Sequence, residues 1–148
     1  MKVIFLDIDG VLNSGDYMNA LHIMTHTHKA KGFSTRDEYG QLFDPRCVLH
    51  LDHIIRSTGA KIVISSTWRR LVGLERLKIM WELRELPGEI IGETPSVLDP
   101  EIAEKYYEPG ADRGYEIQEW LETHPDVESY VILDDDADML RHQNFVQC

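Results

Sequence analysis

The chain is poor in cysteine and in basic residues, and each scarcity excludes a class of protein. Its two cysteines, Cys47 and Cys148, lie far apart without the spacing of a metal site, so we expect free thiols in a reducing compartment. Fifteen basic residues stand against 26 acidic ones. The resulting net charge of −11 disfavours broad binding to nucleic acid or anionic membranes, although a local basic pocket remains compatible with it.

Long apolar runs, internal repeats and low-complexity segments are also missing. No apolar stretch approaches the length of a membrane span, so we expect no membrane partner. The short apolar run at the start is broken by Asp7, which does not fit a signal peptide, and we expect a cytoplasmic protein. The 148 residues and 43% hydrophobic content suit a single domain over residues 1–148 with a sizeable core. Nothing in the sequence indicates an oligomeric state.

What the chain does have is an alternation of short apolar runs and amphipathic segments. We expect strands at 3–6, 60–66, 89–93 and 129–136, with a fifth beginning near 144. We expect helices at 44–59, 67–86, 113–124 and 137–143, and a helical turn within 100–107. This alternation predicts βαβ units, and so a Rossmann-like, doubly wound α/β fold with a mainly parallel sheet and helices on both faces.

Polar clusters follow three of the expected strands. Asp7-Ile8-Asp9-Gly10 ends the first, Ser65-Ser66-Thr67 the second, and Asp134-Asp135-Asp136 the fourth. The carboxyl ends of parallel strands share one edge of the sheet, so these groups are expected to converge. Clustered carboxylates repel one another unless a cation lies between them, and hard oxygen ligands suit Mg²⁺. Polar strand ends are common, but acidic clusters on two distant strands favour a metal site.

These residues resemble the motifs of the haloacid dehalogenase (HAD) superfamily. "DIDGVLN" resembles the first motif, "IVISS" the second, and "VILDDD" the acidic fourth, while Arg113 stands where the family places a Lys or Arg. The signals occur in the family's order, from residue 3 to 138. The runs "SSTWR", "RGYEIQEWL" and "ILDDD" are more narrowly similar to HAD domains associated with RNA-repair proteins.

The resemblance implies a chemistry for Asp7 and Asp9. Asp7 is the expected nucleophile, which attacks phosphorus to form an aspartyl-phosphate. Asp9 is the expected general acid and base. Gly10 is expected to leave room beside the substrate. The expected Mg²⁺ ligands are Asp7, the backbone carbonyl of Asp9, Asp134 and, directly or through water, Asp135.

The resemblance also assigns groups that would bind the phosphoryl oxygens. Ser65 is expected to donate to them, with Ser66 as the substitute if the strand ends one residue later. Arg113 is expected to offset negative charge and to keep the nucleophile ionised.

The Asp at position 9 resembles the first motif of the phosphatase and phosphomutase branches of the family. Residues 14–43 are the large insertion after the first motif, enough for a flap or small lid and too short for a folded cap, so we expect a minimal cap or none. An open site admits a bulky phosphomonoester, and a terminal phosphate of RNA or DNA is our expected substrate. Thr67, Trp68 and Arg69 are the residues expected to line the substrate site, where Trp68 could stack on a base and Arg69 could bind a neighbouring phosphate.

Alternatives remain open at this point. The chain could hydrolyse small nucleotide or sugar phosphates. It could also be a receiver-like or non-catalytic phosphoryl-binding domain, although the third strand ends in Gly92-Glu93-Thr94 rather than in a phosphorylatable Asp. His22, His26 and His28 could bind a metal, but their spacing fits no zinc pattern, and a solvated lid is the preferred interpretation.

Overall fold

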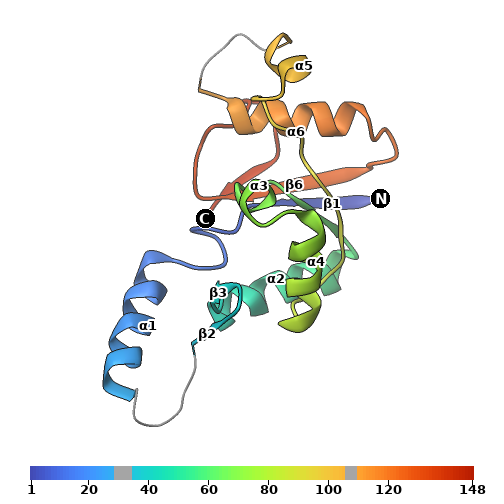
Figure 1. The fold of residues 1–148 in the computed structure, drawn as a ribbon. Coiled ribbons are helices and arrows are strands. Elements are labelled where there is room, and N and C mark those ends of the chain that lie inside the picture. The colour runs from blue at the N-terminus through green and yellow to red at the C-terminus, as the bar shows by residue number, and fades with distance from the viewer. Residues whose placement is uncertain (29–34, 106–109) are drawn as a thin grey trace.

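The computed structural model describes residues 1–28, 35–105 and 110–148, which form a parallel sheet flanked by helices (Figure 1). Within that part of the chain the main sheet has five strands in the order β5-β4-β1-β6-β7, and each neighbouring pair is parallel. The strands are β1 (Lys2–Leu6), β4 (Lys61–Ile64), β5 (Ile90–Glu93), β6 (Ser129–Asp134) and β7 (Phe145–Gln147). The predicted Rossmann-like α/β fold is confirmed.

Helices cover both faces of the sheet because alternate residues of each strand point to opposite sides. The helices are α1 (Gly15–His28), α2 (Pro45–Thr58), α3 (Trp68–Leu71), α4 (Leu74–Leu83), α5 (Pro100–Ala103) and α6 (Asp112–Glu122). Ile4 and Leu6 of β1 are buried in the core that contains residues of α2 and α4. Val3 and Phe5 face α6, where the ring of Phe5 meets that of Trp120 edge-on at 5.4 Å.

Helix α2 begins and ends where the sequence predicts. The side chain of Asp44 accepts a hydrogen bond from the Arg46 amide at 2.9 Å, and Pro45 occupies the first turn. Gly59 closes the helix at φ +70°, a left-handed conformation that glycine adopts without strain.

The helix expected at 67–86 is instead two helices, so that part of the prediction was wrong. α3 and α4 are separated at Gly73, whose φ of +90° cannot continue a helix. The break changes which residues face the core. Leu71 and Ile79 do not face it and are 82% and 56% exposed.

The helix expected at 137–143 was also wrong, since this segment consists of turns and bends. It packs closely against the start of α6. The Gln143 side chain accepts from the Leu140 amide at 2.8 Å and donates to the Gly114 carbonyl at 2.8 Å. A Cβ on Gly114 would lie 2.6 Å from the Leu140 nitrogen, so this approach requires glycine. The tertiary contact overrides local helix propensity here.

The described residues of the insertion at 14–43 form α1 and a small hairpin, β2 (Arg36–Asp37) with β3 (Gly40–Gln41). In Figure 1, α1 extends away from the sheet beyond the carboxyl end of β1. Arg84 of the core binds the hairpin, because its Nε and Nη2 each donate to the Asp37 carboxylate at 2.7 Å. Among the described residues, none of the helices has both the length and the apolar character needed to cross a bilayer.

Candidate active site

The central position of β1 brings three strand ends together. Leu6 pairs with Ile64 of β4 on one side and with Leu133 of β6 on the other. The next residues continue the ladder, since the Asp7 amide donates to the Leu133 carbonyl at 3.0 Å and the Ser65 amide donates to the Leu6 carbonyl at 2.9 Å. The residues that follow or end β1, β4 and β6 therefore meet at one edge of the sheet.

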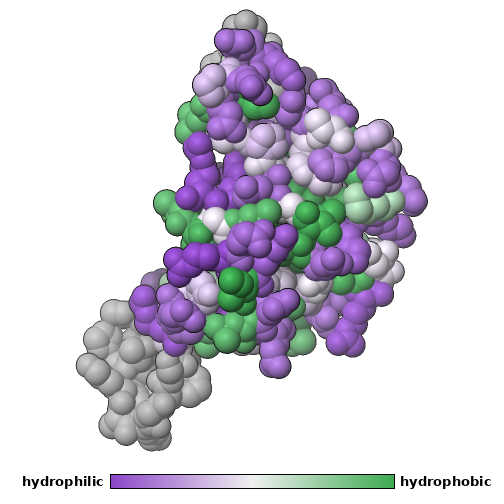
Figure 2. All heavy atoms as spheres, turned by 45° about the vertical axis from the view of Figure 1, so that its right-hand side comes forward, coloured by the Kyte–Doolittle hydropathy of each residue, from purple (hydrophilic) through white to green (hydrophobic). Residues whose placement is uncertain are grey.

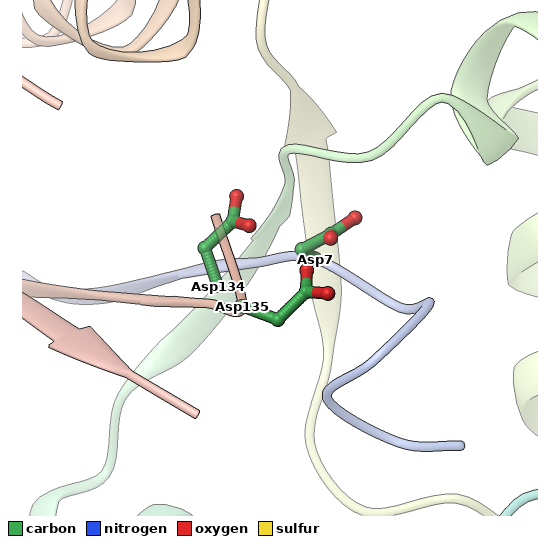
Figure 3. Close-up of side chains that lie close together, drawn as sticks. All are labelled: Asp7, Asp134 and Asp135. Atoms are coloured by element: carbon green, nitrogen blue, oxygen red, sulfur yellow. The ribbon is translucent and has the colours of Figure 1, made fainter. Parts of the chain in front are cut away.

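Asp7, Asp134 and Asp135 form a carboxylate cluster at this edge. Each offers an oxygen that lies within 4.8 Å of the others. Asp7 and Asp134 are 7% and 1% exposed, while Asp135 is exposed to solvent. Figure 3 shows the three side chains at the ends of β1 and β6, with the Asp135 carboxylate turned toward Asp7. Three acidic groups in so small a space call for a positive partner.

Burial and mutual repulsion both disfavour ionisation in this cluster. Burial raises the pKa of Asp7, against the opposing effects of the Ile8 amide and the Arg113 charge. The pKa of Asp134 is raised to about 7, chiefly by burial and also by the neighbouring Asp7 charge, although a hydrogen bond from the Asp136 amide acts the other way. The protein alone thus leaves these carboxylates short of positive charge.

The donor set fits a magnesium ion. One oxygen of Asp134, Oδ2, is buried and accepts no hydrogen bond, although the Nε of Arg113 lies 3.7 Å away. A buried carboxylate oxygen without a hydrogen bond is costly, so its free lone pairs indicate a missing ligand. Oxygen donors alone, from two strands, are what Mg²⁺ prefers.

Gly10 makes room for this cluster. Its φ is +81°, and a Cβ there would lie 2.3 Å from Oδ2 of Asp135. Glycine is needed at this position for the space that the Asp135 carboxylate occupies, while the expected room beside the substrate stays a prediction.

Asp9 lies outside the carboxylate cluster and is exposed. Its Oδ2 accepts a hydrogen bond from the indole Nε1 of Trp68 at 2.9 Å, and its Oδ1 accepts one from the Asn13 side chain at 3.2 Å. Asn13 was not among the expected site residues, and its only signal in the sequence is its position four residues after Asp9. The expected role of the Asp9 carbonyl as a metal ligand stays a prediction.

The three hydroxyl-bearing residues after β4, Ser65, Ser66 and Thr67, lie in different environments. The Ser65 hydroxyl is fully buried and has no hydrogen-bond partner among the residues that the structure describes. The Ser66 hydroxyl is hydrogen-bonded to Asp7, which lowers the pKa of that carboxyl, and it also accepts from the Trp68 amide at 3.3 Å. Thr67 is exposed at the start of α3. Ser66 therefore joins Ser65 as a candidate for contact with the phosphoryl group.

Arg113 lies where the resemblance implies, at the start of α6 and next to the cluster. Its Nη1 donates to the Ser65 carbonyl at 2.5 Å, and its Nε lies 3.7 Å from Oδ2 of Asp134. One side chain thus contacts the loop after β4 and the end of β6, and its charge lowers the pKa of Asp7.

Protein groups already engage most of the Arg69 side chain, and its expected contact with a phosphate stays a prediction. Its side chain is 5% exposed and pairs with Glu116 of α6 at 2.9 Å. Its guanidinium also donates to the carbonyls of Ser66, Thr94 and Pro95. Glu116 was not among the expected site residues, because it lies 47 positions from Arg69 and its only signal is its place on the inward face of α6. Arg69 is therefore a structural group that holds the loops around the site.

A cavity of about 270 Å³ opens beside Arg113. It is lined by exposed and hydroxyl-bearing groups that include Thr67, Arg70, Ser96 and Leu98. Arg70 and Leu98 are exposed at this cavity, whose lining also includes the acidic residues Asp112 and Asp138, so it offers charge of both signs and apolar surface beside Arg113. The side chains of His22, His26 and His28 lie outside the described part of the structure, and their metal role remains untested.

Comparison with known proteins adds one finding. A family model described as "HAD domain in Swiss Army Knife RNA repair proteins" matches residues 3–148. No curated protein and no solved structure matches the chain. Apart from Lys2 of β1, the family match covers every strand of the main sheet, and it includes the whole carboxylate cluster.

Proposed function

The chain belongs to the family of HAD domains in Swiss Army Knife RNA repair proteins, and on this premise we propose that it is a Mg²⁺-dependent phosphomonoester hydrolase. The observation that carries the proposal is the cluster of Asp7, Asp134 and Asp135 at the carboxyl edge of the sheet. A nucleophile and a cation site in one place are what hydrolysis of an anionic ester requires.

In the first step, a carboxylate oxygen of Asp7 attacks phosphorus and forms an aspartyl-phosphate. The ester P–O bond breaks, and the leaving oxygen takes a proton from Asp9. In the second step, water attacks the aspartyl-phosphate and gives its proton to Asp9. Inorganic phosphate leaves, and Asp7 is again a carboxylate.

The groups around Asp7 support both steps. The Ser66 hydroxyl bonds Asp7 and orients its carboxylate, and the unpartnered Ser65 hydroxyl is available to a phosphoryl oxygen. Arg113 offsets negative charge beside Asp7. Preorganised donors of this kind stabilise charge without reorganising during the reaction.

Mg²⁺ would be held by Asp7, Asp134 and Asp135 together with the backbone carbonyl of Asp9. When bound, it supplies positive charge that lets an anionic nucleophile approach an anionic ester.

We further propose a terminal phosphate of RNA or DNA as the substrate, on a single domain whose residues 14–43 act as a small lid. The family's association with RNA repair supports this class of substrate. The described part of the insertion consists of one helix and a short hairpin, which leaves room for a large ligand. The cavity beside Arg113, with Arg70 exposed at its edge, offers charge for a neighbouring phosphate.

The test is a phosphatase panel with Mg²⁺, covering small phosphomonoesters and oligonucleotides phosphorylated at the 3′ or 5′ end. The wild-type protein should release phosphate from the oligonucleotides, and chelation of Mg²⁺ should abolish the activity. Asp7→Asn should lower kcat by about 10³-fold or more because an amide is a poor nucleophile of nearly equal size.

Asp52→Asn is the matched control, since Asp52 lies on α2 in an exposed pair with Arg56 and should retain full activity. Circular dichroism should show Asp7→Asn folded. Substantial turnover by folded Asp7→Asn would exclude the covalent mechanism. A preference for sugar phosphates over oligonucleotides would make the protein a small-metabolite phosphatase.

A further inference from the structure

Both oxygens of the Asp9 carboxylate are held, although Asp9 is exposed to solvent. The indole N–H of Trp68 donates to one at 2.9 Å, and the Asn13 amide donates to the other at 3.2 Å. Asn13 is itself fixed, because its side-chain oxygen accepts from the Gly10 amide at 3.1 Å. An exposed Asp side chain would otherwise move among its rotamers, so these donors select one orientation.

Trp68 is held from two sides. Its backbone amide donates to the Ser66 hydroxyl at 3.3 Å, which ties it to the loop after β4. Its ring packs against Phe43, with the ring centroids 5.9 Å apart. Phe43 is 5% exposed and belongs to the main core. The indole N–H is therefore a fixed donor that links Asp9 to the rigid part of the molecule.

We propose that Trp68 is a positioning residue, which holds the carboxyl of Asp9 in the orientation that delivers a proton to the leaving oxygen. This inference rests on the proposed function, in which Asp9 is the general acid. Proton transfer in a transition state requires the donor within hydrogen-bond reach of the reacting atom. Small misplacements of a catalytic group cost large factors in rate, so a fixed donor to Asp9 matters for the proton transfer.

A positioning role predicts an effect that depends on the leaving group. An alkoxide, such as the ribose oxygen of a nucleotide, is a poor leaving group and needs the proton. A 4-nitrophenolate is stable as an anion and leaves without one. Loss of Asp9 orientation should therefore slow hydrolysis of alkyl esters and spare aryl esters, whereas a loss of packing or of Mg²⁺ affinity would slow both.

The experiment compares Trp68→Phe with the wild type on two substrates, a 3′-phosphorylated oligoribonucleotide and 4-nitrophenyl phosphate. Phenylalanine keeps an aromatic ring against Phe43 and removes the N–H donor. The measured quantity is kcat/KM, which covers the steps up to phospho-enzyme formation and leaves out the later use of Asp9 as a base. We expect kcat/KM for the oligoribonucleotide to fall about tenfold or more, with a change of less than about threefold for 4-nitrophenyl phosphate.

Trp81→Phe is the matched control. Trp81 also packs on Phe43, at 6.5 Å, and its indole N–H donates to the Pro87 carbonyl at 2.8 Å, away from Asp9. Trp81→Phe should leave kcat/KM unchanged for both the oligoribonucleotide and 4-nitrophenyl phosphate. Asn13→Ala removes the other donor without touching the aromatic cluster, and it should give the same selectivity as Trp68→Phe. This second variant decides the matter if Trp68→Phe does not fold.

In an Asp9→Asn background, Trp68→Phe should cause no further loss on the oligoribonucleotide, because it acts through Asp9. Equal losses on both substrates, or no loss on either, would overturn the inference. If the wild type hydrolyses neither ester, the proposed function itself fails. If the wild type is active and Trp68→Phe does not lose more activity on the oligoribonucleotide than on 4-nitrophenyl phosphate, the proposed function stands. The proposed positioning role of Trp68 is then excluded.

Discussion

At the scale of single residues, the site gathers more negative charge than it neutralises. Arg113 stands near both Asp7 and Asp134, but one of its donors is used by the Ser65 carbonyl. Burial raises the pKa of both carboxyls, which means that their ionised forms are destabilised in the fold. A cation that binds the folded chain but not the unfolded chain should therefore raise the melting temperature of the protein as the cation concentration rises.

Gly10→Ala should weaken Mg²⁺ binding. The new Cβ would lie 2.3 Å from Oδ2 of Asp135, and a φ of +81° strains any residue other than glycine. The Asp135 side chain must move, and it moves away from the cation site. We expect Mg²⁺ affinity to fall by about 10–100-fold, measured from the rise in melting temperature with Mg²⁺ concentration.

Gly15→Ala is the control for this prediction, because a Cβ on Gly15 meets nothing within 4 Å and its φ is not positive. An unaltered Mg²⁺ response in Gly10→Ala would mean that Asp135 does not contribute to the cation site.

Arg69 should matter for the stability of the fold. Arg69→Met leaves the Glu116 carboxylate buried without its partner, and breaking a buried ion pair typically costs about 3–5 kcal/mol. We expect a loss of this size in the free energy of unfolding, measured by urea denaturation. Arg70→Met, at the exposed neighbouring position, should lose less than about 0.5 kcal/mol. Similar losses for the two variants would contradict the assignment of Arg69 as structural.

At the scale of elements, the insertion after the first motif is fastened to the core through the hairpin. Arg84 of the segment after α4 binds Asp37 in a two-pronged contact and lies over the Phe43 ring at 4.8 Å. Phe43 in turn contacts Trp68. The hairpin and the Asp9–Trp68 pair therefore share one aromatic support.

The Asp37–Arg84 contact should make stability depend on pH. The hydrogen bonds that Arg84 donates to Asp37 lower the pKa of this carboxyl below its unfolded value of about 3.9. The stabilisation is then fully present above that unfolded value and is lost as pH falls through the lower folded pKa. Asp37→Asn should reduce the urea midpoint by a constant amount above about pH 5, and the deficit should shrink as the pH falls below about 4.

Asp52→Asn is the comparison for this measurement, since it removes a carboxylate from a pair in which Arg56 is 79% exposed, and such pairs contribute little. A deficit for Asp37→Asn that stays constant down to pH 3 would show that the ion pair is not its source.

The sequence predicts those parts of the fold that depend on local pattern or on strand polarity. The meeting of Asp7 with Asp134 follows from parallel strands whose carboxyl ends share an edge. The burial of Arg69 could not be foreseen, because an arginine beside a Ser/Thr cluster resembles a phosphate ligand and its partner Glu116 is distant in the chain. Residues 137–143 do not form the expected helix because their backbone packs closely against Gly114. The hydrophobic periodicity of the segment carries no information about this distant contact.

At the scale of the whole molecule, net charge and site composition act in opposite directions. The charge of −11 opposes long-range attraction of a polyanion. Screening limits that repulsion to about 8 Å at physiological salt, so contact at the site is governed by the groups found there. The surface in Figure 2 shows hydrophilic and hydrophobic residues interspersed on the face in view.

A terminally phosphorylated oligonucleotide should have a higher kcat/KM than the matching mononucleotide. The additional phosphates can reach Arg70 at the edge of the cavity beside Arg113. Arg70→Ala should reduce the advantage of the oligonucleotide and leave the mononucleotide unaffected. Arg56→Ala, on the last turn of α2 at the opposite edge of the sheet, should change neither value. An oligonucleotide advantage that persists in Arg70→Ala would place the contact elsewhere.

The pairing of β1 with both β4 and β6 also has a consequence for the order in which the molecule matures. Asp7 follows β1 and Asp134 ends β6, so their meeting closes a long loop that contains β4 and β5. Such a closure carries the entropy cost of a long-range contact and is expected late in folding. During synthesis, a ribosome-bound chain with β1, β4 and β5 in place would hold only part of the proposed cation site. Mg²⁺ would then stabilise only chains that have added β6, which would make the ion a ligand of the finished sheet and not of its precursors.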